Sequence, residues 1–339
     1  MWYNLSMKKI LMIATGGTIA SRQSDNGLSP QMSGEEMLEF VPQIKEMCEV
    51  ESMQLMNIDS TNISPKEWEL IAKTIEENYE NFDGFVICHG TDTMAYTSAV
   101  LSYLIPKSPK PIVITGSQKP IDLVVTDAKT NLFDSFLYCL SKKACGVCIV
   151  FNGKVINGTR AKKMYSKNYN AFSSINYPLV AIIQDGKVMS YRERKYSGKP
   201  IFYNKLDSSV GVFKMIPGAD SKVLDHYFSF YDAVVVESFG TGGIPDGESK
   251  GFYSIIEKWQ KKGKILVMCT QVVNDGSDMT VYKVGKNLKE KYGFLESYDM
   301  TLEAVVTKLM WILAITKKPS KVKKMFYRNV VDDILYTEE

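Results

Sequence analysis

Hydroxyl and carboxyl side chains gather at four points of the sequence, each directly after a short apolar run. The four segments are 15–18, 59–62, 89–93 and 115–118. A threonine hydroxyl is a weak nucleophile until a base removes its proton. A neutral lysine can be that base, and a carboxylate can orient it, so that the three groups form a triad for acyl transfer. A glycine pair such as Gly16-Gly17 can bring backbone amides close to a carboxylate or an oxyanion.

Each of these segments also has a simpler interpretation. Gly16 and Gly17 could simply form a turn, and segment 16–20 lacks the third glycine of a dinucleotide-binding loop. His89, beside an apolar run, is interpreted as a hydrogen-bonded structural residue. Asp59 and Asp92 could be helix N-caps. Four hydroxyl- and acid-bearing segments at successive strand ends nevertheless favour a site over four unrelated turns.

Strand-like and helix-like segments alternate through the first half of the chain. Strands are predicted at 9–14, 51–58, 84–88, 111–114, 146–151 and 181–183. Helices are predicted between them, one with Ser64 as N-cap and Pro65 in the first position, and two more over 92–104 and 127–140. Apolar strands separated by helices predict an α/β fold with a parallel sheet covered on both faces. The four polar segments should then meet at the carboxyl edge of that sheet, where ligands bind.

The alternation is interrupted near Ser190 by a polar, unpatterned stretch and then resumes. We therefore expect two α/β domains: a larger, flavodoxin-like N-terminal domain over 1–189 that carries the catalytic loops, a linker over 190–208, and a smaller C-terminal domain over 209–339. In the second domain, strands are predicted at 210–215, 233–237 and 265–269, and the last helices at 301–315 and 318–326.

Charge and hydropathy argue against nucleic-acid and membrane partners. The 339 residues carry 41 basic and 38 acidic side chains, a net charge of +3. The one dense basic run is interpreted as a solvated face; it comprises Lys317, Lys318, Lys321, Lys323 and Lys324. No run reaches the ~18–20 apolar residues of a membrane span. The apolar run at 10–14 is shorter than the ~7–15 residues of a secretory signal, so we expect a cytoplasmic protein.

Six cysteines are present, most of them inside apolar runs, where a free thiol behaves as a small buried hydrophobe. Cys145 and Cys148 have the spacing of a redox motif, but 147–151 is predicted to be a buried strand. The two histidines are too few to build a zinc site with these cysteines. A reducing compartment and no bound metal are expected.

Two of the polar segments resemble the signature motifs of the bacterial-type L-asparaginase family. Residues 15–20 read Thr-Gly-Gly-Thr-Ile-Ala and residues 89–94 read His-Gly-Thr-Asp-Thr-Met. The resemblance continues through 115–118 and 238–245, covers 8–330, and is closest to the cytoplasmic type I branch. It implies an amidohydrolase of L-asparagine that forms a threonine acyl-enzyme and needs no cofactor or metal. It also implies a homodimer or homotetramer.

Residue by residue, the resemblance implies four catalytic groups. Thr18 matches the nucleophile, Thr91 and Asp92 match the second threonine and the aspartate, and Lys163 matches the lysine. Lys162 is adjacent, so a one-residue shift of that match stays open. Which threonine attacks first is also left open by the residues. The resemblance further implies substrate-binding residues, with 59–61 holding the α-carboxylate and amine; they are Gly17, Asp59, Ser60, Thr61, Gly90 and Ser117.

One position departs from the family pattern. Many members carry a tyrosine on the loop after the first motif, whereas this chain has Leu28 there. A leucine cannot relay a proton, so another group must assist Thr18 or activity is lower. Tyr165 and Tyr169 are candidates because of their proximity to Lys163 in the sequence.

Three other functions remain open at this point. The ammonia-releasing subunit of a tRNA-dependent amidotransferase shares both motifs but usually has an additional N-terminal domain, whereas here the first motif starts within about fifteen residues of the N-terminus. A non-catalytic amino-acid-binding protein would fit Leu28 but not the intact catalytic set. Glutamine is a possible main substrate, because one methylene changes discrimination by only ~1–3 kcal/mol.

Overall fold

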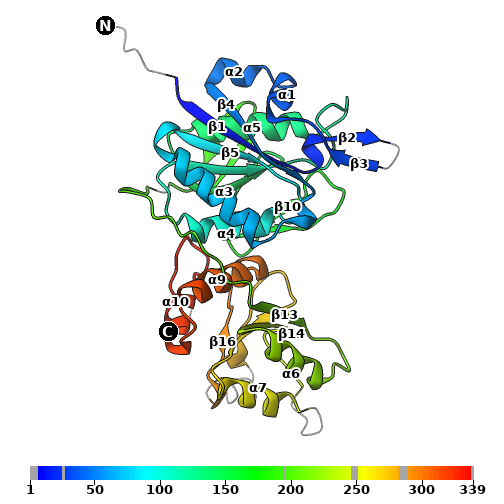
Figure 1. Ribbon diagram of the computed structural model, residues 1–339, viewed down its shortest axis with the longest axis vertical. Helices are drawn as coiled ribbons and strands as arrows, with labels where there is room; N and C mark the ends of the chain where they lie inside the picture. The colour runs from blue at the N-terminus through cyan, green and yellow to red at the C-terminus, as the bar shows by residue number, and fades with distance from the viewer. Residues whose placement is uncertain are drawn as a thin grey trace. The chain divides into compact units, whose positions relative to one another are not determined.

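The chain forms two α/β units, each with its own sheet. The computed structural model describes residues 7–24, 27–193, 195–245, 251–281, 289 and 291–336. The two compact units are Met1–Asn204 and Lys205–Glu339 (Figure 1). The division between them falls inside 190–208, the range in which the sequence predicts the linker.

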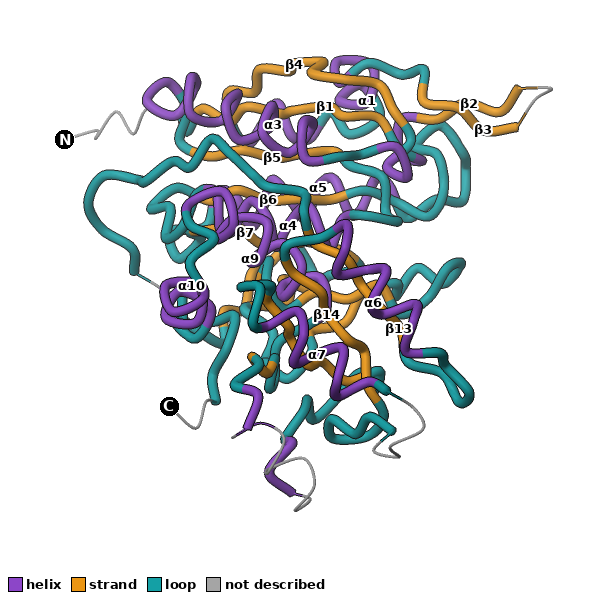
Figure 2. Tube along the Cα trace, turned by 60° about the horizontal axis from the view of Figure 1, so that its bottom comes forward, coloured by secondary structure: helices purple, strands orange, loops and turns teal. Residues whose placement is uncertain are grey.

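The N-terminal unit is built on an eight-stranded sheet in the order β12-β11-β8-β7-β6-β5-β1-β4. Its five parallel strands are, in spatial order, β4 (Glu49–Ile58), β1 (Lys9–Gly16), β5 (Gly84–Cys88), β6 (Pro111–Thr115) and β7 (Gly146–Phe151). By chain position these are the second, first, third, fourth and fifth parallel strands, as predicted for a flavodoxin-like sheet. Figure 2 shows the five strands side by side. The strand order reverses between β1 and β5, so a ligand is expected at the carboxyl ends of these two strands.

The remaining three strands are antiparallel, although the sequence led us to expect only parallel ones. They are β8 (Lys154–Asn157), β11 (Ala181–Gln184) and β12 (Lys187–Ser190). Two-residue turns explain the difference, because both turn residues in Asn152-Gly153 and Asp185-Gly186 have positive φ. Such Asn-Gly and Asp-Gly pairs favour tight hairpins, which join antiparallel neighbours. The strand predicted at 181–183 therefore extends the sheet in the antiparallel sense.

Helices cover both faces of this sheet. On one face α3 (Pro65–Asn78) contacts α4 (Met94–Leu104), whereas on the other α2 (Gln43–Met47) contacts α5 (Ala128–Leu140) near α1 (Gly34–Glu39). Helices α4 and α5 connect successive strands in the same direction across the sheet but lie on opposite faces. One of these two crossovers must therefore be left-handed, which is rare in parallel sheets.

Helix α3 begins as the sequence predicts. Pro65 is its first residue, and the Ser64 hydroxyl accepts a hydrogen bond from the Lys66 amide while the Glu67 carboxylate accepts one from the Ser64 amide. These contacts satisfy amides that have no partner in the first helical turn. Trp68 and Ile71 lie on the buried side of this helix, so α3 is fixed against the sheet behind the second polar segment.

Helix α5 carries a buried acid. Asp134 is 7% exposed, and its side chain makes no hydrogen bond or ion pair with any residue in the described ranges. Burial raises the pKa of its carboxyl to about 6, because a low-dielectric surrounding disfavours the charged form.

Asp134→Asn is expected to stabilise the folded protein above pH 6 by about 2–3 kcal/mol and to change nothing near pH 4. The folded-state pKa of about 6 lies above the ordinary value of 3.8, so the folded protein binds the proton more tightly than the unfolded chain. The penalty of the buried carboxylate is therefore complete above pH 6 and disappears as the pH falls toward 3.8. Urea unfolding at pH 8 and at pH 4 measures the difference. The exposed Asp122 provides a matched Asp→Asn control, and an equal gain at both pH values would contradict the assignment.

The C-terminal unit repeats the alternation on a smaller scale, as predicted. Its sheet is wholly parallel and consists of β13 (Val210–Lys214), β14 (Ala233–Ser238), β15 (Ile265–Thr270) and β16 (Leu295–Glu296). Its longer helices are α6 (Ser221–Phe230), α7 (Phe252–Gln260), α9 (Leu302–Ile315) and α10 (Pro319–Phe326). The lysines of the basic run are all exposed, as expected, and Lys317 pairs with Asp207 and Asp232.

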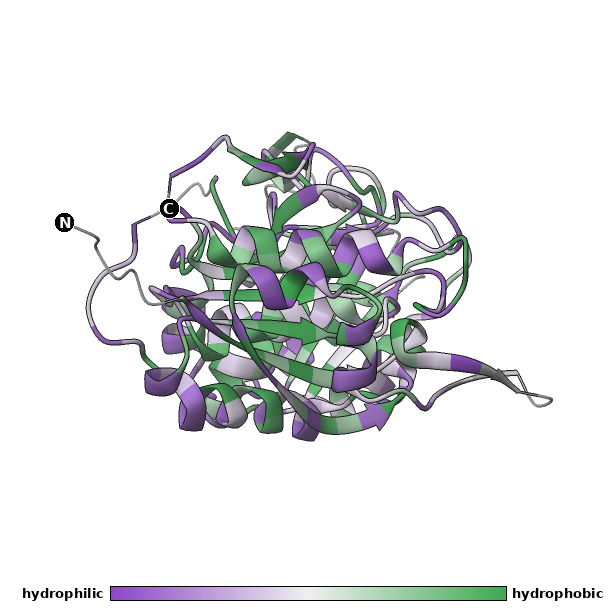
Figure 3. Cartoon of the chain, turned by 90° about the horizontal axis from the view of Figure 1, so that it is seen from above, coloured by the Kyte–Doolittle hydropathy of each residue, from purple (hydrophilic) through white to green (hydrophobic). Residues whose placement is uncertain are grey.

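Apolar residues fill the interior of both units. Figure 3 shows hydrophobic residues along the strands and hydrophilic ones on outer helices and loops. All six cysteines are free and buried, and burial raises the pKa of Cys48 to about 11. Cys148 lies within β7, which confirms the strand interpretation over the redox motif. No helix within the described ranges is long and apolar enough to span a membrane.

Candidate active site

Three of the four polar segments meet in one small hollow at the carboxyl edge of the N-terminal sheet. The hollow lies where the strand order reverses, as expected for a ligand site. Its lining residues come from the ends of β1, β4 and β5 and from the hairpin of β2 (Ser21–Ser24) and β3 (Gly27–Pro30). They are Gly17, Thr18, Ser21, Pro30, Asp59, Ser60, Gly90, Thr91 and Asp92.

Two glycines allow the first and third segments to touch. Gly17 has a φ of 76°, and a Cβ built on it would lie 2.4 Å from the Cα and N of Gly90. A Cβ on Gly90 would lie 2.5 Å from the Ser60 hydroxyl oxygen. A side chain at position 17 would force the two backbones apart, and one at position 90 would displace the Ser60 side chain, so both glycines allow the close packing of the hollow.

Thr91, Asp92 and Lys163 form a connected group. The Lys163 ammonium nitrogen lies 2.8 Å from the Thr91 hydroxyl oxygen and 2.6 Å from Asp92 Oδ1. The side chain of Asp92 is 58% exposed, that of Lys163 is 17% exposed, and Thr91 is buried. The hydroxyl, the amine and the carboxylate are therefore in direct hydrogen-bond contact, as a triad for acyl transfer requires.

A short hairpin presents Lys163. The residue ends β9 (Ala161–Lys163), which pairs antiparallel with β10 (Phe172–Ser174), and Lys163 lies opposite Phe172. Successive side chains of a strand point to opposite faces. Lys162 is therefore directed away from the side on which Lys163 reaches Thr91 and Asp92.

Thr18 is half-buried and lines the hollow at the start of the 3₁₀ turn Thr18–Ala20. Gly17 is the N-cap residue of that turn and directly precedes Thr18. The hairpin β2–β3 follows at once, and Ser21 and Pro30 from it complete the rim. Leu28 belongs to β3, but its side chain lies outside the described part of the chain. Neither Tyr165 nor Tyr169 lines the hollow.

In the second segment, one carboxylate oxygen of Asp59 caps a short helix, and the other faces no donor among the described residues. Asp59 Oδ1 accepts hydrogen bonds from the Thr61 amide and hydroxyl, both at 2.9 Å. The prediction that Asp59 is an N-cap is thus confirmed. Its Oδ2 atom has no partner among the residues that the structure describes. The corresponding interpretation of Asp92 is wrong, because the N-cap of α4 is Thr93.

Three successive backbone amides at the hollow have no acceptor among the described residues. The amides of Gly90, Thr91 and Asp92 donate to no residue within the described ranges, although Gly90 and Thr91 are buried. Buried backbone amides in native proteins are almost always paired. Successive unpaired amides form an anion-binding concavity, which suits a carboxylate or an oxyanion.

His89 supports this loop instead of entering the hollow. It is fully buried, and burial lowers its pKa to about 4, so the ring is neutral. Nδ1 donates to the Gly90 carbonyl at 2.6 Å, and Nε2 accepts from the Thr97 hydroxyl at 3.0 Å. The Trp68 indole donates in turn to Thr97. The prediction of a structural histidine is confirmed.

The fourth segment differs from the other three. Ser117 is buried, its hydroxyl donates to the Lys119 carbonyl, and it is not part of the lining. The neighbouring Gln118 instead reaches the Thr91 hydroxyl at 3.5 Å. Gln118 belongs to this segment, and only its position beside Ser117 in the sequence pointed to a role for it.

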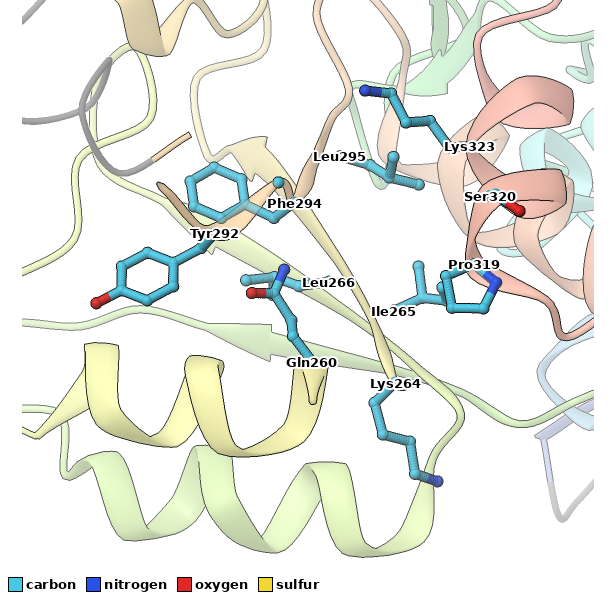
Figure 4. A pocket seen from close by; sticks show the side chains of 11 residues that line it. Gln260, Lys264, Ile265, Leu266, Tyr292, Phe294, Leu295, Pro319, Ser320 and Lys323 are labelled. Atoms are coloured by element: carbon cyan, nitrogen blue, oxygen red, sulfur yellow. The ribbon is translucent and has the colours of Figure 1, made fainter. Parts of the chain in front are cut away.

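A second hollow, of about 250 Å³, lies in the C-terminal unit (Figure 4). Its wall includes Ile265, Leu266 and Leu295 with Pro319 and Ser320 from the start of α10. No carboxylate belongs to its lining among the described residues. This hollow therefore lacks the combination of groups needed for acyl transfer.

Family models and relatives match nearly the whole chain. The model of the asparaginase N-terminal domain matches residues 9–196, and that of the glutaminase/asparaginase C-terminal domain matches 209–326. The chain is 36% identical to the L-asparaginase of Thermococcus kodakarensis, over 96% of this chain and 99% of that one. It is 33% identical to a subunit of the glutamyl-tRNA(Gln) amidotransferase of Aeropyrum pernix, over 96% of this chain and 79% of that one.

Solved structures agree with these matches. The thermostable L-asparaginase from Thermococcus kodakarensis has a TM-score of 0.91 at 35% identity, over 97% of this chain and 100% of that one. L-asparaginase I from Vibrio cholerae gives 0.86 at 28% identity, over 98% of this chain and 100% of the other. The probable cytoplasmic L-asparaginase from Campylobacter jejuni has a TM-score of 0.80 at 28% identity, over 95% of this chain and 100% of that one. With both domain models matched in order and three of the polar segments joined in one hollow, the chain belongs to the asparaginase family.

Proposed function

We propose that this protein is an L-asparagine amidohydrolase that releases L-aspartate and ammonia through a threonine acyl-enzyme. The observation that carries the proposal is the contact of Lys163 with both Thr91 and Asp92, at the edge of a hollow that Thr18 lines. These groups supply a nucleophile, a proton carrier and an orienting carboxylate.

Thr18 is the better candidate for the first attack. Its side chain is half-buried and faces the hollow, whereas the Thr91 hydroxyl is buried and already bonded to Lys163. Thr18 Oγ1 adds to the carboxamide carbon, and its proton passes through Thr91 and Lys163 to the departing nitrogen. The C–N bond then breaks, ammonia leaves, and an aspartyl ester on Thr18 remains.

In the second step, Thr91 and Lys163 take a proton from a water molecule. The water oxygen adds to the ester carbon, the C–O bond to Thr18 breaks as that proton returns to Thr18 Oγ1, and L-aspartate is released. Asp92 holds Lys163 at 2.6 Å throughout. Because one proton carrier serves both steps, the reaction has no need of a tyrosine at the position of Leu28.

The amino-acid end of the substrate would be held by the second segment. Asp59 Oδ2 and the exposed carboxylate of Asp92 suit the α-amine, while Ser60 and the backbone at Gly17 and Gly90 suit the α-carboxylate. Thr61 keeps Asp59 in place by its two hydrogen bonds. The unpaired amides at 90–92 suit the oxyanion, and one such donor is often worth ~3–4 kcal/mol in the transition state.

An amidotransferase component is the competing function. The Aeropyrum pernix relative has a similar identity, but this chain spans 79% of its length and 99% of the Thermococcus L-asparaginase. The higher identity to the L-asparaginase, 36% against 33%, supports a free amidohydrolase. By the same likeness we propose a homodimer or homotetramer, and the Campylobacter relative supports a cytoplasmic location.

Ammonia release from the purified protein tests the proposal. L-asparagine and L-glutamine are supplied separately, and faster release from L-asparagine is the expected result. Faster release from L-glutamine would keep the mechanism and change the substrate. No release from either, with L-asparagine binding still detected by calorimetry, would instead favour the amidotransferase component or the binding protein.

A further inference from the structure

We propose that Gln118 is a positioning residue for the Thr91–Lys163 pair. Its carboxamide directs the Thr91 hydroxyl on one side and fixes the loop that follows Lys163 on the other. The inference rests on the proposed function and deepens it, because it adds a residue that controls the proton carrier.

The two ends of the carboxamide have different partners. Gln118 Oε1 lies 3.5 Å from the Thr91 hydroxyl oxygen, at the outer limit of a hydrogen bond. Gln118 Nε2 donates to the carbonyl oxygens of Asn168 at 3.1 Å and Tyr165 at 3.3 Å. An amide nitrogen carries two protons and an amide oxygen accepts, so this set of contacts fixes the orientation of the carboxamide.

Gln118 is itself anchored by its backbone. Its amide donates to both carboxylate oxygens of Asp127, at 3.1 and 2.9 Å. Asp127 also accepts from the Lys119 amide and from the Asn131 side chain. The backbone of Gln118 therefore cannot shift without breaking several hydrogen bonds, so its side chain extends from a fixed position.

The contact with Thr91 decides where the hydroxyl proton points. When Lys163 donates to Thr91 Oγ1, the single hydroxyl proton must point elsewhere. Gln118 Oε1 is the acceptor within reach. The remaining lone pair of Thr91 can then accept a hydrogen bond from water or from the Thr18 hydroxyl in the hollow, so Lys163 and Gln118 together fix the direction in which Thr91 meets that group.

The hydrogen bonds from Gln118 to loop 164–170 restrain the segment that directly follows Lys163. Loop 164–170 is closed at its base, where the amides of Met164 and Tyr165 both donate to the Ala171 carbonyl. The Gln118 carboxamide is bonded to two carbonyls farther along this loop. The backbone of Lys163 is therefore held by the β9–β10 pairing, and the loop that follows it in the sequence is held by Gln118.

Two variants separate these contributions. Gln118→Met keeps the length of the side chain and removes both contacts. Gln118→Glu keeps the acceptor for Thr91, loses the donors to the loop, and places a negative charge near Lys163. Asp122→Asn, four positions after Gln118, is the control, because Asp122 is exposed and has no hydrogen bond or ion pair to the described residues.

Gln118→Met is expected to lower kcat about tenfold, with KM for L-asparagine within about twofold, since one orienting hydrogen bond is lost and the substrate-holding residues are untouched. For Gln118→Glu, kcat should fall less than for Gln118→Met, because the acceptor for the Thr91 hydroxyl is kept. Hydrogen–deuterium exchange in loop 164–170 should speed up in both variants and stay unchanged in Asp122→Asn.

Each arm can overturn the inference. Unchanged kcat in Gln118→Met would remove the role toward Thr91, and equal losses of kcat in Gln118→Met and Gln118→Glu would reduce Gln118 to a purely structural contact. If the wild-type protein releases no ammonia, the proposed function has failed, and the exchange measurement still decides the role of Gln118. Unchanged exchange in both variants would then refute it.

Discussion

Replacing Thr18 with alanine will abolish ammonia release, with kcat reduced by about 10⁴-fold or more, because removal of the nucleophile removes the acyl-enzyme path. Thr18 is half-buried at the start of a 3₁₀ turn, and the Ser21 amide bonds to its carbonyl. Alanine retains that backbone bond, so the fold should not change. A coupled assay for ammonia with L-asparagine measures the effect.

Two controls separate lost chemistry from lost binding. Thr18→Ala should still bind L-aspartate in calorimetry, since the residues proposed to hold the amino-acid end are intact. Thr18→Ser keeps a hydroxyl and should retain measurable turnover. If Thr18→Ala retains more than about a tenth of the wild-type kcat, the nucleophile lies elsewhere, and Thr91 becomes the first alternative.

Replacing Lys163 with methionine will lower kcat by about 10²–10⁴-fold, the usual contribution of a positioned proton carrier. Methionine fills similar space but cannot accept or donate a proton. Loss of the ion pair with Asp92 should cost about 1 kcal/mol of stability or less, because the carboxylate is 58% exposed. Steady-state kinetics combined with thermal unfolding separates the two effects.

Lys163→Arg shows which property of lysine matters. Arginine keeps the positive charge beside Asp92, but it stays protonated in proteins and cannot take a proton. If Lys163 carries the proton, the arginine variant should be nearly as slow as the methionine variant. Recovery of most of the wild-type kcat in Lys163→Arg would instead mean that Lys163 supplies only charge.

Most of the parallel core was predictable because its signals are local. Strands at 84–88 and 146–151 are continuous apolar runs, and the structure has them as Gly84–Cys88 and Gly146–Phe151. The start of α3 was equally local, since Ser64, Pro65 and Glu67 act on one helical turn. Such features depend on neighbours in the sequence, so the chain carries them without reference to the rest of the fold.

Two of the antiparallel strands, β8 and β12, were missed, and so was the antiparallel direction of β11, although their turns are visible in the sequence. Asn152-Gly153 and Asp185-Gly186 are tight-turn pairs, but the runs that follow them are short, and β8 and β12 have four residues each. Runs of that length give little periodic signal. For the same reason, the sequence indicates only a loop where the structure has the β2–β3 hairpin.

By itself, the sequence determined the types of chemical group and the sheet edge on which they stand, because strand ends and the polar residues after them are fixed by local pattern. Only the tertiary structure decided which groups touch. Lys163 lies 72 positions from Thr91, yet its amine is 2.8 Å from that hydroxyl. Ser117 turned inward to a backbone carbonyl while Gln118 turned to Thr91. Contacts between distant segments depend on how whole strands and loops pack, and no local pattern specifies a side-chain direction across that distance.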